Sequence, residues 1–242
     1  FLPELAKKLR GGLVRLMFNF LHEFWIIFMH GLPKLILLAE FSGETETTAY
    51  QKALAAEKSL AGLNLNTKIS LPGYDTEKYW LMRRESFNFL REKIKNLRTA
   101  PFIDDIIVQP KRLPEFLPQL YSILDGYPII YTVAGHVGDG NFHIIPLMDF
   151  ANPKSKDYVI QISRKVYDLV IKFGGSISAE HNDGLIRGPY LKQFFGAEVY
   201  GLFEQTKKIF DPEDIFNPGK KVGARLEYAL DHLDYIAPNK KV

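Results

Sequence analysis

The order of apolar and polar residues in the first half of the chain predicts alternating strands and helices. Residues 35–41 form a continuous apolar run of strand length, so we expect a core strand there. An alanine-rich helical pattern covers residues 48–60, and a second helix is expected from 76 to 97. Residues 102–108 have the pattern of a strand, and residues 113–124 carry apolar side chains at helical spacing.

The second half predicts a hairpin followed by helices. Residues 127–150 show strand, glycine turn and strand, and a long helix (156–173) and a short strand (176–179) follow. After Pro189 the pattern becomes helical. We therefore predict an α+β fold, in which helices cover an antiparallel sheet in a ferredoxin-like cap, with a small C-terminal helical subdomain.

Changes in this pattern suggest four segments. We predict an N-terminal helical segment (1–30), an α+β cap or substrate domain (31–188), a helical subdomain (189–223) and a C-terminal tail (224–242).

Composition narrows the class of protein. The 242 residues are 46% hydrophobic, which is enough to bury a core. Lys and Arg number 31 against 28 Asp and Glu, without a basic block, so nucleic acid is not an expected partner. The lack of cysteine excludes disulfides and a cysteine-ligated iron–sulfur cluster within this sequence.

One N-terminal stretch is unusually apolar. Residues 13–29 are interrupted by Arg15, Asn19, His22 and Glu23, and so fall short of the roughly 18 uninterrupted apolar residues of a membrane span. We expect either a buried helix or an interface for another domain. The sequence shows no pattern of a signal peptide, which favours a cytoplasmic protein or one peripheral at the inner face of a membrane.

The densest chemical signal is the segment GHVGDGNFH at residues 135–143. Asp139-Gly140 between two apolar runs is a strong signal for a two-residue hairpin turn. With that turn His136 faces His143 directly, with Cβ atoms about 4.5–5.5 Å apart. Two imidazoles at this separation can bind one metal ion.

Glu180 and His181 offer further ligands at the end of the expected strand 176–179. Successive strand residues point to opposite faces, so we assign Glu180 to the metal and His181 to the reacting carbon of the substrate. Two histidines and one carboxylate suit zinc, and also accept manganese or iron(II). The alternative is that the histidines satisfy the backbone of a tight turn and that Glu180 and His181 lie in a surface loop.

Three segments, residues 135–143, 178–184 and 195–220, resemble in this order the C-terminal domain of the FAD-linked oxidases. This family includes D-lactate dehydrogenases, the glycolate oxidase flavin subunit and D-2-hydroxyglutarate dehydrogenase. The resemblance covers about residues 35–222 and implies an α+β cap that closes over the flavin. We find no glycine-rich loop for a dinucleotide, so we expect another domain or subunit to hold most of the FAD.

The resemblance implies roles for the predicted site. His136, His143 and Glu180 would bind a divalent metal that holds the hydroxyl and carboxylate of the substrate, so His136 also belongs to the substrate site. His181 would contact the substrate and remove the hydroxyl proton while hydride passes to the flavin. A metal lowers the pKa of a bound hydroxyl, and a histidine can accept its proton near neutral pH.

Two more segments resemble family elements. Trp80 and Arg83 match a tryptophan-x-x-arginine element whose arginine binds the substrate carboxylate, a bidentate task that suits a guanidinium. The alternative for Arg83 is a surface helix arginine. Asn217, Gly219 and Lys220 match the segment that approaches the isoalloxazine ring, although a simple Pro-Gly turn would also explain them.

Three positions depart from the family pattern. Asn182 replaces the usual glycine after the Glu-His pair, which is tolerable because asparagine adopts positive φ more readily than most residues. Ile145 and Asp104 stand where members that use 2-hydroxyglutarate have asparagine and lysine. These two differences argue against a second substrate carboxylate.

We therefore expect the substrate- and metal-binding half of an FAD-dependent dehydrogenase or oxidase that acts on a D-2-hydroxy acid such as lactate or glycolate. The FAD-binding half would dock at residues 18–29, and a separate iron–sulfur protein would accept the electrons. Two alternatives stay open: a metal-dependent hydrolase that uses the same ligands with bound water, and a non-catalytic remnant that only binds a partner.

Overall fold

The computed structural model describes 35–71, 76–77, 79–81, 83 and 97–233. The chain divides into two compact units, residues 1–93 and 94–242, which are described separately. The helical segment, interface and docking site predicted within residues 1–30 lie outside the described residues. The four predicted domain boundaries remain predictions.

The N-terminal unit contains the helix α4 (Glu46–Leu60), followed by a 3-10 turn, η1 (Ala61–Leu63). Thr45 caps α4, because its hydroxyl accepts the Thr48 N–H at 3.2 Å and the Thr48 hydroxyl accepts the Thr45 N–H at 3.0 Å. The helix therefore begins at Glu46, two residues before the predicted start. Where the structure describes residues 76–83, they are also helical, as predicted.

Residues 35–41 do not form the predicted core strand. The segment has no regular secondary structure and pairs with none of the described strands, and Leu35 and Leu37 are 70% and 63% exposed. A strand needs a neighbour to satisfy its backbone N–H and C=O groups, and a continuous apolar run cannot show where that neighbour lies. The prediction of a core strand was wrong within the described structure.

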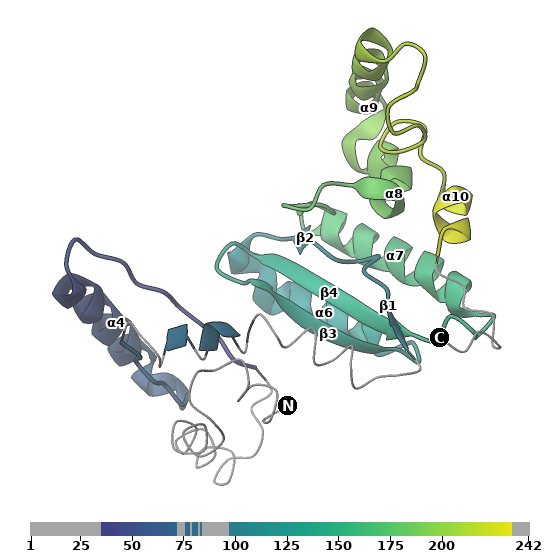
Figure 1. Ribbon diagram of the computed structural model, residues 1–242. Helices are drawn as coiled ribbons and strands as arrows, with labels where there is room; N and C mark the ends of the chain where they lie inside the picture. The colour runs from purple at the N-terminus through teal and green to yellow at the C-terminus, as the bar shows by residue number, and fades with distance from the viewer. Residues whose placement is uncertain (1–34, 72–75, 78, 82, 84–96, 234–242) are drawn as a thin grey trace. The chain divides into compact units, whose positions relative to one another are not determined.

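An antiparallel sheet forms the centre of the C-terminal unit (Figure 1). In the hairpin, the strand β3 (Ile130–His136) pairs over its whole length with residues 141–147 of β4 (Asn141–Met148). Two short strands share the other edge of β4: β1 (Arg98–Thr99) pairs with its end and β2 (Ile106–Ile107) with its beginning.

Two helices cover one face of this sheet, α6 (Leu113–Leu124) and α7 (Ser155–Lys172) (Figure 1). The core is formed by apolar side chains of α6, α7 and β4, namely Phe116, Leu120, Leu124, Val159, Ile162, Val166, Val170, Phe142, Ile144 and Met148. Alternation along β4 therefore directs His143 to the opposite face. The predicted α+β fold is confirmed, as are the hairpin and both helices.

The edge of the sheet is interrupted between β1 and β2, where the sequence predicted a continuous strand over 102–108. The side chains of Phe102 and Ile103 turn into the core instead. Asp105 has a positive φ of 66°, which is incompatible with a strand. This bulge between β1 and β2 contains Asp104 and Asp105.

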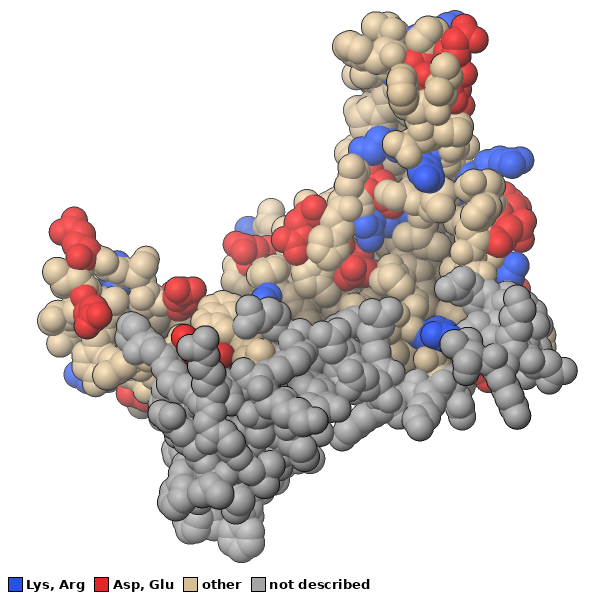
Figure 2. Space-filling view, viewed as in Figure 1, with Lys and Arg blue, Asp and Glu red and all other residues tan. Residues whose placement is uncertain are grey.

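The chain is helical from Gly184 to Phe210, which agrees with the helical pattern predicted after Pro189, whereas residues 211–225 form turns and irregular structure. It forms α8 (Gly184–Arg187), η3 (Gly188–Tyr190), α9 (Leu191–Phe210) and α10 (Leu226–Asp231). Gly196 bends α9 with φ 80° and ψ 166°. Figure 2 shows both acidic and basic side chains on the surface of this unit. None of the helices in the described part of the chain has the length and apolar character needed to cross a membrane.

Candidate active site

The β3–β4 hairpin brings His136 and His143 together with a different register from the predicted one. His136 pairs with Asn141, and His143 pairs with Ala134. The loop has four residues, 137–140, because the carbonyl of Gly140 accepts the Val108 N–H at 3.0 Å and is held against the sheet edge. The prediction that the two histidines face each other directly was therefore wrong.

Both histidines nevertheless lie on one face of the sheet. In the observed register His136 and His143 are diagonal neighbours, and diagonal residues on one face remain within reach of aromatic side chains. Their ring centroids are 5.6 Å apart and the ring planes are perpendicular, at 89°. The predicted convergence of the two imidazoles is thus present.

Glu180 and His181 lie on a loop, residues 176–183, which we call the site loop. Only Ser176 forms a β-bridge, with Ile107, so the predicted strand 176–179 was wrong. Beyond this bridge the Asp105 carboxylate accepts the N–H groups of Ala179 at 2.8 Å and His181 at 2.9 Å, and that of Glu180 between them at 3.1 Å. Three consecutive N–H groups directed at one anion curl the backbone, so strand alternation does not separate Glu180 from His181.

Asp105 itself is fully buried. Burial alone would raise the pKa of its carboxyl, but the N–H groups of His181, Ala179 and Glu180 and the side-chain amide of Asn141 lower it to about 2. An oxygen of Asp105 lies within 4.8 Å of ligand atoms of His143, Glu180 and His181. Because its lone pairs already accept these hydrogen bonds, we assign Asp105 to support of the loop rather than to a metal.

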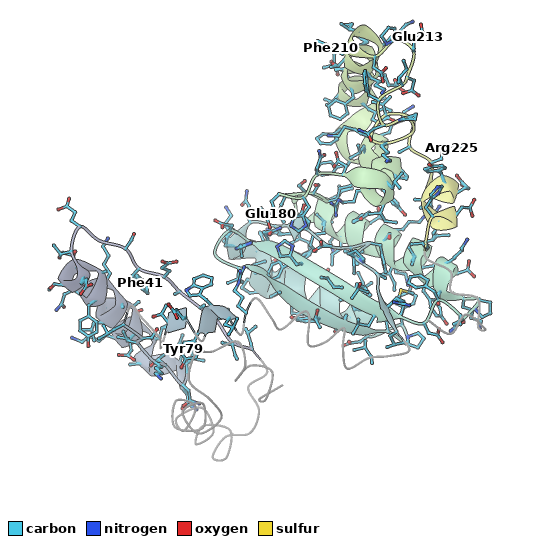
Figure 3. The ribbon with its side chains drawn as sticks, in the orientation of Figure 1. Phe41, Tyr79, Glu180, Phe210, Glu213 and Arg225 are labelled. Carbon is cyan, nitrogen blue, oxygen red and sulfur yellow. The ribbon has the colours of Figure 1, made fainter. Side chains whose placement is uncertain are left out.

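Glu180 is the centre of the cluster that we call the His/Glu cluster: His136, His143, Glu180 and His181. Its Oε1 atom lies 3.0 Å from Nε2 of His143, 3.4 Å from Nε2 of His181 and 3.5 Å from Nε2 of His136. Ligand atoms bound about 2.0–2.1 Å from a tetrahedral ion lie about 3.3 Å from one another, which is close to these three separations from Glu180. The ligand atoms that all lie within 4.8 Å of one another are those of Asp105, His143, Glu180 and His181, a group without His136. Figure 3 shows Glu180 beside the β3–β4 hairpin.

Asp104 supports two rings of the cluster at once. Its Oδ1 atom lies 3.0 Å from Nδ1 of His143, and its Oδ2 atom lies 3.2 Å from Nδ1 of His181. An ionised carboxylate can only accept, so both Nδ1 atoms donate. The lone pair of each neutral ring is then on Nε2, the atom that faces Glu180.

Arg187 is almost fully buried and binds the site loop through a backbone carbonyl group. Its Nε and Nη2 atoms donate to the carbonyl of Asn182, and its Nη1 atom donates to the carbonyl of Asp104 at 2.8 Å. Sequence reasoning missed the supporting roles of Asp104, Asp105 and Arg187. The one available signal was the pair of acidic residues inside the apolar run 102–108.

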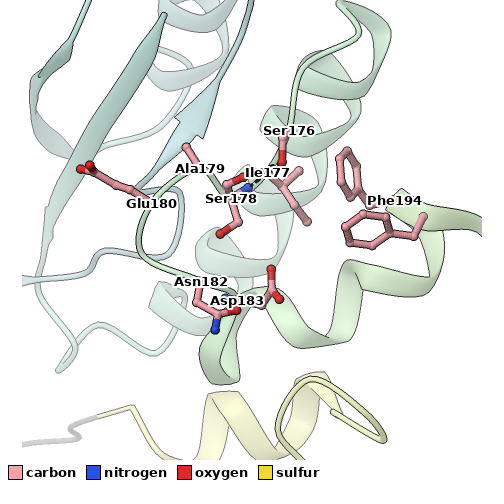
Figure 4. Close-up of a pocket in the computed structure, with 9 residues that line it drawn as sticks. Ser176, Ile177, Ser178, Ala179, Glu180, Asn182, Asp183 and Phe194 are labelled. Atoms are coloured by element: carbon pink, nitrogen blue, oxygen red, sulfur yellow. Dashed lines mark hydrogen bonds between the residues drawn. The ribbon is translucent and has the colours of Figure 1, made fainter. Parts of the chain in front are cut away.

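A cavity of about 310 Å³ lies beside the site loop, between it and the side chains of Phe194 and Phe195 (Figure 4). Figure 4 shows the Glu180 side chain directed away from Phe194, toward the strands. Its carboxylate therefore serves the His/Glu cluster.

The remaining predicted residues lie in other segments of the sequence. Arg83 lies in the N-terminal unit, with its guanidinium carbon 5.7 Å from the centroid of the Trp80 ring. Asn217, Gly219 and Lys220 form an exposed turn in which the Lys220 N–H donates to the Asn217 carbonyl at 3.2 Å. Their roles toward substrate and flavin stay predictions.

The chain is similar in sequence to several known proteins. The chain is 28% identical over 190 residues to D-2-hydroxyglutarate dehydrogenase of Escherichia coli (strain K12), covering 76% of this chain and 19% of that protein. It is 28% identical over 193 residues to glycolate oxidase subunit GlcD of Bacillus subtilis (strain 168), covering 78% of this chain and 40% of that protein. D-lactate dehydrogenase of Archaeoglobus fulgidus is 34% identical over 118 residues, covering 49% of this chain and 26% of that protein.

The chain thus spans well under half the length of these relatives. A family profile described as FAD linked oxidases, C-terminal domain, matches residues 29–221, which include the whole His/Glu cluster. The chain belongs to the family of FAD-linked oxidase C-terminal domains, as the three ordered segments of its sequence indicated.

Proposed function

We propose that this chain is the substrate- and metal-binding half of a flavin-dependent dehydrogenase that oxidises a D-2-hydroxy acid to the 2-oxo acid. One observation carries the proposal: three imidazole Nε2 atoms lie within 3.5 Å of a single Glu180 oxygen. Membership of a flavin-linked family supports it.

His136, His143 and Glu180 would hold the metal, with zinc the best fit and manganese or iron(II) acceptable. Glu180 and His136 are about half exposed, so one side of the cluster is open to a substrate. The bound metal would lower the pKa of the substrate hydroxyl, and the flavin would accept the hydride.

His181 would accept the hydroxyl proton at Nε2. Its Nδ1 hydrogen bond to Asp104 would put the lone pair of the neutral ring on Nε2, and the same carboxylate would stabilise the imidazolium that forms. Arg83 would bind the substrate carboxylate as a bidentate partner.

A small monocarboxylate, lactate or glycolate, is the substrate class that we propose. Asp104 and Glu180 place two carboxylates at the cluster, and a second substrate carboxylate would meet their repulsion. Ile145 shares the sheet face of His143 and offers no hydrogen bond to such a group. Two of the relatives, glycolate oxidase subunit GlcD and D-lactate dehydrogenase, carry names that fit this class.

Most of the FAD would be held by a separate domain or subunit, with Asn217, Gly219 and Lys220 reaching the ring. The surface of α9 and the loop after it supports such a partner, because it exposes several large apolar side chains: Leu202, Ile209, Phe210, Ile215 and Phe216. Figure 3 shows Phe210 at the end of α9. The electrons would pass on to a separate iron–sulfur protein.

Flavin titration and dye reduction test the proposal. We expect the purified chain alone neither to hold FAD tightly nor to oxidise any 2-hydroxy acid, and to do both when combined with a flavin-binding half. In the assembled enzyme D-lactate or glycolate should be oxidised faster than D-2-hydroxyglutarate. Stoichiometric FAD binding with turnover by the lone chain would contradict the division of labour, and metal-dependent ester hydrolysis without flavin would favour a hydrolase.

A further inference from the structure

Two buried residues of opposite charge hold the site loop by its backbone. Asp105 binds three consecutive N–H groups, those of residues 179–181. Arg187 binds the carbonyl of the next residue, Asn182. The loop that carries Glu180 and His181 is therefore held at three consecutive peptide groups by Asp105 and at one further peptide group, that of the Asn182 carbonyl, by Arg187.

The same two residues also join the site loop to the sheet edge. Asp105 belongs to the bulge between β1 and β2, and its neighbour Asp104 accepts a hydrogen bond from Nη1 of Arg187 at 2.8 Å. The side chain of Asn141, at the start of β4, donates to Oδ1 of Asp105 at 3.1 Å. We call this arrangement of Asp105 and Arg187 the loop clamp.

The loop clamp acts directly on the atoms that form the His/Glu cluster. The Glu180 N–H lies 3.1 Å from both oxygens of Asp105, so the backbone of the central carboxylate residue is held at its own amide. Metal and catalytic groups need their geometry within about 0.5 Å, and a free loop of this length would not supply it. Asp104, which orients His143 and His181, is held by the same arginine.

We propose that Asp105 and Arg187 are positioning residues of this site, which hold Glu180 and His181 in the geometry that binds the metal. The inference rests on the proposed function. Asp105 must be a carboxylate, because an asparagine would turn an NH₂ donor toward backbone N–H donors. Arg187 must be an arginine, because lysine lacks the planar fork that reaches two carbonyls.

Hydrogen exchange of the full chain tests the clamp without any metal. In Asp105→Asn we expect faster exchange of the amides of residues 179–181. Asp211→Asn is the matched control, because Asp211 is also a buried aspartate that accepts two backbone N–H groups, those of Ile215 and Phe216, both at 2.9 Å. That variant should speed exchange at 215–216 only. Unchanged exchange at 179–181 in Asp105→Asn would overturn the clamp.

The positioning role is tested by zinc titration of the same proteins, at a temperature below the midpoint of thermal unfolding of each protein. We expect Asp105→Asn and Arg187→Lys to weaken zinc binding by about 10- to 100-fold, because this is the usual effect of removing a residue that supports metal ligands. Asp211→Asn should leave zinc binding unchanged. If Asp105→Asn does not fold, Arg187→Lys decides. Wild-type zinc affinity in a folded variant with a loosened loop would overturn the positioning role. A wild-type chain that binds no zinc, with the exchange difference intact, would overturn the proposed metal site and support the clamp.

Discussion

The imidazole rings of His143 and His181 lie face to face, with centroids 4.7 Å apart and planes 10° from parallel. Both bind the same Asp104 carboxylate through Nδ1 and direct Nε2 to Glu180. A proposed metal ligand and the proposed base therefore share one support. Substitution of each ring separates the two roles.

His143→Ala should remove the metal. His143 is the ring closest to Glu180, at 3.0 Å, and a remnant of two ligands binds a metal far more weakly than three. Elemental analysis of purified protein should show about one divalent ion per wild-type chain and almost none in the variant. His232→Ala is the control, because its ring bonds the carbonyl of Tyr228 and not the cluster. Equal metal in wild type and His143→Ala would contradict the assigned site.

His181→Asn should lower turnover of the assembled enzyme by about 100-fold or more, and leave the metal content intact, because it removes a general base but no assigned ligand. Strand alternation does not separate the role of His181 from that of Glu180, because His181 Nε2 lies 3.4 Å from Glu180 Oε1. Turnover and elemental analysis of one preparation decide. Loss of metal would instead identify His181 as a ligand with His143 and Glu180.

Asp104→Asn should weaken zinc binding and slow turnover, each by about 10- to 100-fold. An amide offers one acceptor and one donor end, so it cannot accept from both Nδ1 atoms. Zinc titration and turnover at saturating zinc separate the two effects. Asp139→Asn is the control, because it removes an exposed charge from the β3–β4 hairpin loop and should change neither value. If zinc affinity and turnover were the same in Asp104→Asn and Asp139→Asn, Asp104 would act only through its charge or would have no role at the site.

Asp105 should make stability depend on pH in the acid range. Its pKa is lowered from 3.8 to about 2 in the folded chain. A carboxyl whose pKa is lowered by folding stabilises the folded chain at any pH above its pKa in the unfolded chain, here by about 2 kcal/mol. This stabilisation is lost as the pH falls toward the pKa of the carboxyl in the folded chain. The difference in unfolding free energy between wild type and Asp105→Asn should therefore shrink from pH 5 to pH 2. Urea unfolding across this range measures it; a constant difference would contradict the assignment.

Gly140→Ala should destabilise the fold by about 2 kcal/mol or more. Gly140 has φ +75°, and a Cβ there would meet the carbonyl oxygen of Val108 at 1.8 Å. Gly138 lies in the same hairpin loop with open space around it, so Gly138→Ala is the matched control. Thermal unfolding compares the two, and equal midpoints would show that the observed register is wrong.

Much of the site could be predicted from local patterns. Alternation and the glycine-rich turn indicated the β3–β4 hairpin, and helical spacing indicated α6 and α7, because both periods reflect which side chains meet the core. Residue chemistry then indicated His136, His143, Glu180 and His181. The order of three segments indicated the family, which the comparison confirmed.

The sequence by itself thus determined the residue types of the site and the elements that carry them, because these depend on neighbours a few positions apart. Only the tertiary structure decided how those residues meet. The hairpin register depends on the contact of Gly140 with Val108, and the path of the site loop depends on Asp105 and Arg187. Local periodicity carries no information about such contacts, since the buried N–H and C=O groups of a loop take whichever partner the folded chain brings to them.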